Sequence, residues 1–322
     1  MDKIVIGLDI GGTTVKIGFL AEDGEIVKKW KIPTNKKNQG KFIVEEIWQS
    51  VLKNLPSLNL DQQSIFSIVA GAPGFVDKKS GVIYEAVNIG WKNYDLAGQL
   101  KAVADVPVFI ENDANLAALG ENWKGAGAGS RNMIAITLGT GVGGGIIANG
   151  EILSGVNGTG GEIGHIKAES DGASCNCGRK GCLETIVSAT GLVRQAVELI
   201  NDNPSSNLSD LYHKNGEISA KDIFSLAGKG DILSRQIINR NTDILGSVLA
   251  SLSVIVNPSI ITIGGGLSQA GEPFINAIAD SFRRQAMPRV SEVCSIKEAE
   301  LGNDAALIGA ARVNNEFEKI HL

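Results

Sequence analysis

The sequence has little cysteine, no long hydrophobic run and no excess of positive charge. Its first apolar run, residues 4–8, ends at Asp9 and is too short for a signal peptide or a membrane span. Four cysteines in 322 residues do not suggest a disulfide scaffold, and a net charge of −5 offers no basic face to nucleic acid. We therefore expect a cytoplasmic protein that binds neither nucleic acid nor a membrane.

The chain is long enough for two domains at roughly 150 residues each. Hydrophobic residues make up 43% and charged residues 20%, which suffices to fill two cores. Glycine is abundant: 40 of 322 residues, against an average usage of about 7%. The glycines cluster in short motifs, so they indicate specific turns and not a flexible linker.

One pattern of strands and turns occurs twice. An apolar strand over residues 4–8 leads into a glycine turn and then into a strand whose apolar residues alternate. The order strand, glycine turn, strand returns from residue 133, with its glycine turn at 139–145. Two copies favour a duplicated α/β architecture; the alternative is a chance likeness between two hairpins.

Apolar periodicity predicts helices over 42–55, 183–200 and 244–256. A strand is expected at 259–263, after the helix stop Asn257-Pro258, and residues 201–215 are expected to form a surface loop. Helices that alternate with strands indicate an α/β protein with largely buried sheets.

Both glycine turns have the chemistry of a phosphate clamp. Glycines let backbone N–H groups approach an anion closely, and Thr13 adds a hydroxyl donor. Because no helix follows the first turn, it matches neither the Walker loop nor the dinucleotide fingerprint. A glycine bend between two strands is typical of actin-like and hexokinase-like folds. One such bend could be a mere hairpin turn, whereas two favour clamps that face one cleft.

Asp113 has two interpretations. It follows an apolar strand over 106–110 and precedes a helical run, which is where an N-cap residue belongs. A carboxylate at the C-terminal end of a strand, in a crevice of an α/β sheet, also suits a general base. The position alone does not separate the two roles.

A metal site is predicted by His165, Cys175, Cys177 and Cys182. Three thiolates and an imidazole satisfy tetrahedral Zn²⁺ and leave no open position, so the metal would be structural. The spacing is not that of a common zinc finger, and three packed free thiols are the alternative. Cys294 stands alone and is expected to be a small buried apolar residue.

The motifs together resemble the ROK family (repressors, open reading frames and sugar kinases). They occur in family order, and residues 87–125 are similar to the glucokinases of Gram-positive bacteria. The segments that carry the resemblance are residues 9–16, 88–94, 111–115, 138–145, 161–165, 175–184 and 301–305.

The resemblance implies an actin-like ATPase (ribonuclease H-like) fold of two duplicated α/β domains with a cleft between them. The small domain would comprise residues 1–117 plus 304–322, and the large domain residues 118–303 with the zinc-binding loop. The implied reaction is that of glycolytic glucose phosphorylation, ATP + D-glucose to ADP + glucose 6-phosphate. The resemblance also implies a homodimer.

Roles for single residues follow from the same resemblance. Asp113 would be the catalytic base, and Asp9 would orient Mg²⁺. His165 would place one nitrogen on zinc and the other toward the sugar. The substrate-binding set would be Gly74, Asn88, Asn112, Glu162, His165 and Glu184. The ATP-binding set would be Asp9, Gly11, Gly12, Thr13, Lys16, Gly139, Thr140, Gly141, Gly264, Gly265 and Gly266.

Several alternatives stay open. N-acetylmannosamine, fructose or allose could replace glucose, and polyphosphate could replace ATP. The family also includes sugar-sensing repressors, but those carry an N-terminal helix-turn-helix domain, whereas this chain enters its first strand by Ile4. Actin-like filament and chaperone proteins lack a segment like residues 165–184.

Overall fold

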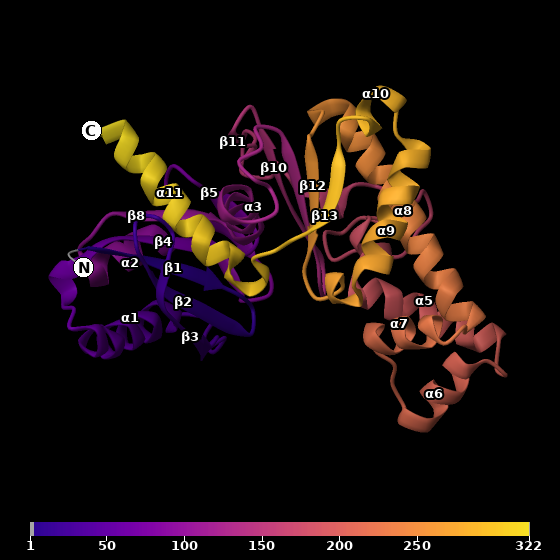
Figure 1. Ribbon diagram of the computed structural model, residues 1–322. Coiled ribbons are helices and arrows are strands. Elements are labelled where there is room, and N and C mark those ends of the chain that lie inside the picture. Colours follow the sequence, from indigo (N-terminus) through magenta and orange to yellow (C-terminus); the bar gives the residue numbers. More distant parts are fainter. Residues whose placement is uncertain (1–2, 322) are drawn as a thin grey trace.

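Two five-stranded sheets with the same strand order form the framework of the protein (Figure 1). The computed structural model describes the backbone of residues 3–321 and the side chains of residues 3–316. The first sheet has the order β3-β2-β1-β4-β8: β1 (Ile4–Ile10), β2 (Thr14–Leu20), β3 (Ile26–Pro33), β4 (Ile65–Ala72), β8 (Val108–Asn112). The second has the order β11-β10-β9-β12-β13: β9 (Met133–Leu138), β10 (Val142–Ala148), β11 (Glu151–Ile152), β12 (Ile260–Gly264), β13 (Ser295–Glu298).

The pairing directions also match between the sheets. β1 is antiparallel to β2 and parallel to β4, and β9 is antiparallel to β10 and parallel to β12. In both copies the glycine turn joins the central strand to its antiparallel neighbour. The duplicated α/β architecture predicted from the repeated pattern is therefore confirmed.

Helices cover both sheets, and one of them, α3, contacts both. α3 packs on β9 and β10 of the second sheet as well as on β4 and β8, while α11 packs on α3, β1, β2 and β4. The helices are α1 (Ile43–Asn54), α2 (Leu96–Ala104), α3 (Asp113–Lys124), α4 (Glu184–Val187), α5 (Ala189–Asp202), α6 (Asn207–Asn215), α7 (Ala220–Gly228), α8 (Ile232–Val256), α9 (Glu272–Gln285), α10 (Pro288–Ser291) and α11 (Ala305–His321). Short 3₁₀ turns lie at Leu55–Leu58, Gln62–Ser64, Ile163–His165, Ser268–Ala270 and Gly302–Asp304.

The C-terminal helix α11 returns to the first half of the chain and crosses α3 closely (Figure 1). A Cβ atom at Gly309 would lie 1.9 Å from the carbonyl oxygen of Leu116, and one at Gly120 would lie 2.0 Å from that of Ala305, so only glycine fits the crossing. Leu307 and Ala310 of α11 are buried in one core with Val69 and Leu116.

The carboxylate of Glu121 secures the place where the chain passes between the two halves. It is buried at the end of α3 and accepts hydrogen bonds from the backbone N–H groups of Ala126, at 3.1 Å, Glu300, at 3.1 Å, and Leu301, at 2.7 Å. Two chain segments that are distant in sequence, at residue 126 and at residues 300–301, are thus held by one side chain.

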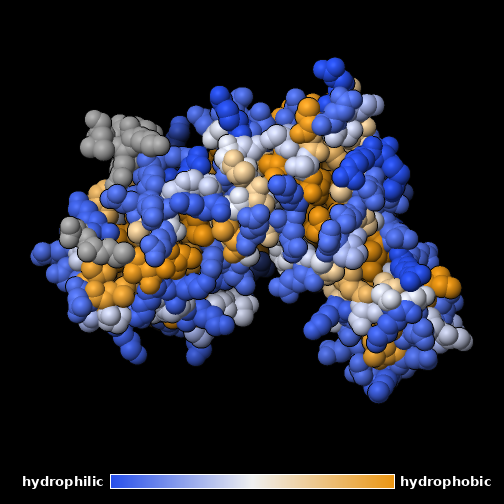
Figure 2. All heavy atoms as spheres, viewed as in Figure 1, coloured by the Kyte–Doolittle hydropathy of each residue, from blue (hydrophilic) through white to orange (hydrophobic). Residues whose placement is uncertain are grey.

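A third sheet was not predicted from the sequence. It has the order β5-β6-β7, with β5 (Phe75–Asp77), β6 (Val82–Ala86) and β7 (Trp91–Asp95). Its short strands carry mixed polar and apolar residues, so no clear two-residue period marks them. Figure 2 shows the surface indented between the two halves of the molecule.

Two helix predictions need correction. The helix expected over 183–200 is broken at Ser188, whose side chain caps α5 by accepting from Gly191 N–H at 3.0 Å. The loop expected at 201–215 contains α6, which is capped by Ser206. In both places a serine begins a new helix, because its hydroxyl takes up a backbone N–H that has no partner in the helix.

The predicted domain boundary after residue 117 falls within α3, and the ends of the predicted small domain, residues 1, 2 and 322, lie outside the described residues. The division into domains stays a prediction. Among the described residues, no helix combines the length and the apolar character that a membrane crossing requires.

Candidate functional site

The carboxyl ends of three parallel strands bring acidic residues to one edge of the first sheet. In the register of β1, β4 and β8, Asp9 lies opposite Gly71, and Gly71 lies opposite Glu111. Asp113 follows Glu111 by two residues, at the start of α3. The strand ends of an open α/β sheet are where ligands bind, so this edge is the natural place for the site.

The N-cap of α3 is Asn112 and not Asp113. The side-chain oxygen of Asn112 accepts from the N–H groups of Ala114, at 2.9 Å, and Asn115, at 3.1 Å. Its amide nitrogen donates to the carbonyl oxygen of Gly74 at 3.2 Å. The interpretation of Asp113 as the cap is therefore wrong, which leaves its carboxylate without that structural role.

Burial raises the pKa of Asp113 to about 6, and the negative charges of Asp9 and Glu162 act in the same direction. A hydrogen bond from Ala114 N–H, at 2.8 Å, opposes the shift. A carboxyl group with a pKa near 6 is ionised at neutral pH and yet basic enough to take a proton from a hydroxyl group.

The first glycine turn is a tight backbone loop beside Asp9. Gly11 N–H donates to the carbonyl oxygen of Thr14 at 3.0 Å, and a Cβ atom at Gly12 would lie 3.0 Å from Cβ of Asn88. Lys16 does not point freely into the loop, because its ammonium pairs with Asp9 at 2.9 Å. Asn88 and the turn are thus neighbours, although 76 positions separate Gly12 from Asn88.

The second glycine turn contacts one of the predicted sugar-binding acids. Glu184 accepts a hydrogen bond from Val142 N–H at 2.9 Å, directly after Gly141. The turn is closed by Gly139 N–H, which donates to the carbonyl oxygen of Gly141 at 2.9 Å. The triplet Gly264–Gly266 lies beside it, since Leu267 N–H donates to the carbonyl oxygen of Leu138 at 3.0 Å.

A cavity of about 440 Å³ opens beside the second turn. Thr140, Thr190, Val193 and Ser219 are among the residues that line it. Its walls combine hydroxyl groups with apolar surface, the mixture that small-molecule sites use.

The four predicted metal ligands come together. The ligand atoms of His165, Cys175, Cys177 and Cys182 all lie within 4.8 Å of one another. Sγ of Cys175 is 3.6 Å from Nδ1 of His165, and Sγ of Cys177 is 3.6 Å from Sγ of Cys182. Tetrahedral zinc with Zn–S bonds of about 2.3 Å sets two sulfurs about 3.8 Å apart. The donor set and its spacing therefore fit a structural Zn²⁺.

The other nitrogen of His165 faces the acidic site. Its Nε2 is 3.9 Å from a carboxylate oxygen of Glu162. Burial raises the pKa of Glu162, the neighbouring His165 opposes this, and the negative charge of Glu184 adds to it. Glu162, His165 and Glu184 therefore form one electrostatic group, with Nδ1 of the histidine turned toward the thiols.

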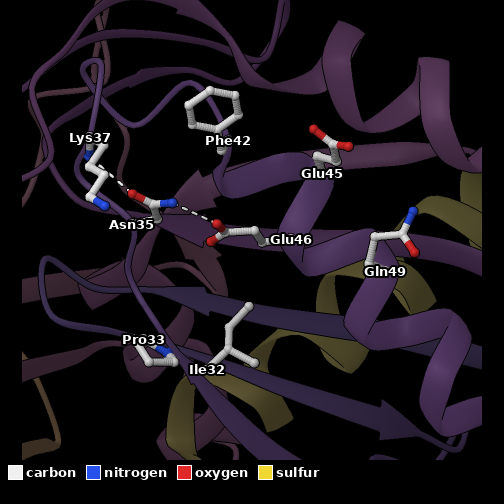
Figure 3. Close-up of a pocket in the computed structure, with 8 residues that line it drawn as sticks. All are labelled: Ile32, Pro33, Asn35, Lys37, Phe42, Glu45, Glu46 and Gln49. Atoms are coloured by element: carbon white, nitrogen blue, oxygen red, sulfur yellow. Dashed lines mark hydrogen bonds between the residues drawn. The ribbon is translucent and has the colours of Figure 1, made fainter.

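A wider cavity of about 750 Å³ lies between the end of β3 and the first turns of α1 (Figure 3). Within it, Asn35 donates to Glu46 at 2.6 Å and accepts from Lys37 N–H at 3.1 Å. Its lining includes none of the predicted site residues, so volume alone does not mark the site in this protein.

Sequence reasoning assigned no role to two side chains that brace the site. Glu111 is buried and accepts from Asn112 N–H and from the side-chain amide of Asn115, both at 2.9 Å. Thr190 donates to the carbonyl oxygen of Thr140 at 2.8 Å. Glu111 could have been singled out from the sequence because it is an acidic residue at the end of an apolar strand, whereas nothing local marked Thr190.

Comparisons with known proteins agree on one family. The sequence model described as "ROK family" matches residues 5–316. The glucokinase of Halalkalibacterium halodurans is 47% identical over 323 residues, which cover 99% of this chain and 98% of the relative. The crystal structure of a ROK family glucokinase from Streptomyces griseus in complex with glucose and AMPPNP has 36% identity and a TM-score of 0.80, and the match covers 96% of this chain and 98% of that one.

A regulator is also similar in structure. A ROK family transcriptional regulator, a homologue of the Escherichia coli MLC protein, has 27% identity and a TM-score of 0.85; the match covers 97% of this chain and 77% of that one. These likenesses confirm the actin-like ATPase fold that the sequence motifs implied.

Proposed function

The chain belongs to the ROK family, and from this premise we propose that it transfers the γ-phosphoryl group of ATP to the 6-hydroxyl of D-glucose. The products are ADP and glucose 6-phosphate, and we propose that the reaction takes place in the cytoplasm. One observation carries the proposal: Asp113, with its pKa near 6, lies within the electrostatic reach of both Asp9 and Glu162. A base between a phosphate loop and a polyol-binding acid is what a sugar kinase needs.

In this mechanism Asp113 accepts the proton of the sugar 6-hydroxyl while the oxygen of that hydroxyl attacks the γ-phosphorus of ATP. Phosphoryl transfer has a loose transition state, so positioning and charge neutralisation account for most of the catalysis. Glu162, His165 and Glu184 would accept or donate hydrogen bonds at the other sugar hydroxyls, with Asn88, Asn112 and Gly74 closing the opposite side. Carboxylates suit sugar binding because each oxygen can accept from a sugar O–H.

The two glycine turns would hold the phosphates of ATP. Backbone N–H groups of Gly12 and Thr13, and of Thr140 and Gly141, would supply donors without a bulky side chain, while Gly11 and Gly139 close the two turns through their own N–H groups. The 440 Å³ cavity beside Thr140 supports a nucleoside position next to the second turn, with Gly264–Gly266 at its border.

Mg²⁺ is proposed to enter with the nucleotide beside Asp9. Magnesium in such sites takes one or two carboxylates plus substrate phosphates, and Asp9 is the penultimate residue of β1, just before the phosphate turn, so the residue fits. When bound, the ion would neutralise phosphate charge. Lys16, through its ion pair with Asp9, would fix the orientation of that carboxylate.

Activity measured on a panel of hexoses tests the proposed substrate specificity. With ATP as donor, we expect kcat/KM for glucose to exceed that for fructose, allose and N-acetylmannosamine by about 10- to 100-fold, because a misplaced hydroxyl leaves a buried carboxylate unpaired, which costs about 1–3 kcal/mol. ADP release measures the rates, and polyphosphate in place of ATP tests the donor. Equal turnover of N-acetylmannosamine would contradict glucose specificity, and glucose binding without turnover would favour a sugar sensor.

The pKa of Asp113 predicts the acid limb of the pH profile. A general base must be ionised, so kcat/KM should be level above about pH 7 and fall toward tenfold per unit below the pKa of about 6. Initial rates between about pH 4.5 and 8 with glucose well below its KM measure this. A profile that stays level down to about pH 5 would show that no group of this pKa acts as the base.

We also propose a homodimer, which rests on the family alone. Light scattering at micromolar concentration checks it, and the mass of one chain would contradict it.

A further inference from the structure

One lysine in the third sheet contacts both halves of the protein. Lys78 lies in the turn between β5 and β6. Asp77 holds this turn by accepting from Lys79 N–H at 3.0 Å and from the Ser80 hydroxyl at 2.9 Å. The backbone that carries Lys78 is therefore fixed, and its long side chain reaches away from a defined point.

On one side, Lys78 pairs with the buried carboxylate of Glu111. Its Nζ contacts Oε2 of Glu111, whose side chain is only 3% exposed. The other oxygen, Oε1, accepts from Asn112 N–H and from the amide of Asn115. Through these hydrogen bonds Glu111 fixes Asn112 and Asn115, which lie on either side of Asp113 in the sequence. A buried carboxylate needs a counter-charge, and among the described residues Lys78 is the cation paired with it.

On the other side, Lys78 reaches the loop that leads to Glu162. Its Nζ also donates to Oγ of Ser154 at 3.1 Å. Ser154 follows β11 of the second sheet, and its carbonyl oxygen accepts from Gly160 N–H at 2.9 Å, which closes the loop. The same loop presses on β5 at a second point, where Gly158 has φ +79° and a Cβ atom would lie 2.2 Å from the carbonyl oxygen of Val76. Only glycine allows this approach.

We propose that Lys78 is a positioning residue for phosphoryl transfer, holding Glu111 behind Asp113 and the loop of residues 154–161 in one fixed arrangement. The inference rests on the proposed function. It explains why the third sheet is there, because β5 and β6 carry the lysine that sets the base on the first half against the sugar-binding acid on the second. Positioning matters because a misplacement of about 1 Å can cost about 10²-fold in rate.

Kinetics of matched variants test the inference. Lys78→Met keeps the length of the side chain and removes its charge, and we expect kcat to fall about tenfold or more and the KM for glucose to rise, with the KM for ATP within about twofold. Lys78→Arg should restore most of the activity, since guanidinium can pair with Glu111 and reach Ser154. Lys79→Met, the neighbouring exposed lysine of the same turn, is the control and should behave as wild type.

Ser154→Ala isolates the contact between the halves. It leaves the pair of Lys78 and Glu111 intact, so the melting temperature should change little while the KM for glucose rises several-fold. If Lys78→Met melts lower but keeps wild-type kcat and KM values when assayed below its melting point, the ion pair only stabilises the fold and the inference is overturned.

If Lys78→Met does not fold, Ser154→Ala decides alone, and a wild-type KM for glucose overturns the inference. Wild-type protein that fails to phosphorylate glucose contradicts the proposed function itself, and the inference falls with it. If the wild type is active and the Lys78 and Ser154 variants have wild-type kcat and KM values, only the positioning role is contradicted.

Discussion

Asp113→Asn is expected to lower kcat by about 10²–10⁴, the usual range for loss of a general base, which corresponds to a barrier increase of about 2.7–5.5 kcal/mol. An amide has nearly the same shape as a carboxylate but cannot accept the proton of the sugar hydroxyl. Because Glu162, His165 and Glu184 are unchanged, glucose should still bind. Steady-state kinetics and calorimetric glucose titration on the purified variant measure the two effects separately.

Stability provides the control for this variant. The pKa of Asp113 is about 6 in the folded protein against an ordinary 3.8, so the folded state holds the proton more tightly than the unfolded state. The stability that Asp113 contributes is therefore present below about pH 4 and is lost as pH rises through about 6. Asparagine carries no such penalty. At about pH 7 the variant should be at least as stable as wild type, by up to about 3 kcal/mol and less where water screens the charge.

Since Asn112 is the cap of α3, the substitution removes no cap. A variant that melts at or above the wild-type temperature, binds glucose and barely turns over supports the base. Near-wild-type kcat would contradict the mechanism, whatever the melting temperature.

Zinc removal should have the second large effect. We expect about one zinc per chain in protein purified without added metal, and we expect Cys177→Ala to lower the melting temperature by about 10 °C, as a loss of several kcal/mol gives in a chain of this size. Glucose affinity should fall about 10- to 100-fold, because the metal orients His165, whose Nε2 faces Glu162 at 3.9 Å. Elemental analysis, thermal melts and glucose titration measure these effects.

Cys294→Ala is the matched control for Cys177→Ala, because it removes a thiol that is not a predicted zinc ligand. Cys294 lies outside the cluster, and burial raises the pKa of its thiol to about 11, so it should keep the metal, the glucose affinity and nearly all of the stability. Active enzyme without zinc would refute a structural role for the metal, and so would a Cys177→Ala variant that matches Cys294→Ala in all three measurements.

The features that the sequence predicted correctly are those with a local cause. The glycine turns after β1 and β9 could be recognised because an apolar run leads directly into a glycine cluster. The second turn is shorter than the predicted 139–145, since Gly143, Gly144 and Gly145 pair with β9 as part of β10. The grouping of His165 with three cysteines was also visible, since few arrangements of soft ligands serve another purpose.

The features that sequence reasoning missed depend on long-range contacts. The caps at Ser188 and Ser206 were hidden inside a periodic stretch and a polar stretch. The hairpin that carries Lys78 has no strong period, and its partners Glu111 and Ser154 are 33 and 76 positions away in the chain. The assignment of the cap to Asn112 required knowledge of which side chain turns back toward the helix, a choice that two adjacent polar residues leave open.

The return of α11 to the first half has a consequence for the order of synthesis. About 180 residues separate the end of α3 from the start of α11, and at about 5–20 residues per second a ribosome needs roughly 10–40 s to make them. During that time Val69 and Leu116 lack the cover that Leu307 and Ala310 later supply. The half of the protein that is translated first is therefore the half that is finished last, and this part of its apolar core stays uncovered on the nascent chain until α11 is made.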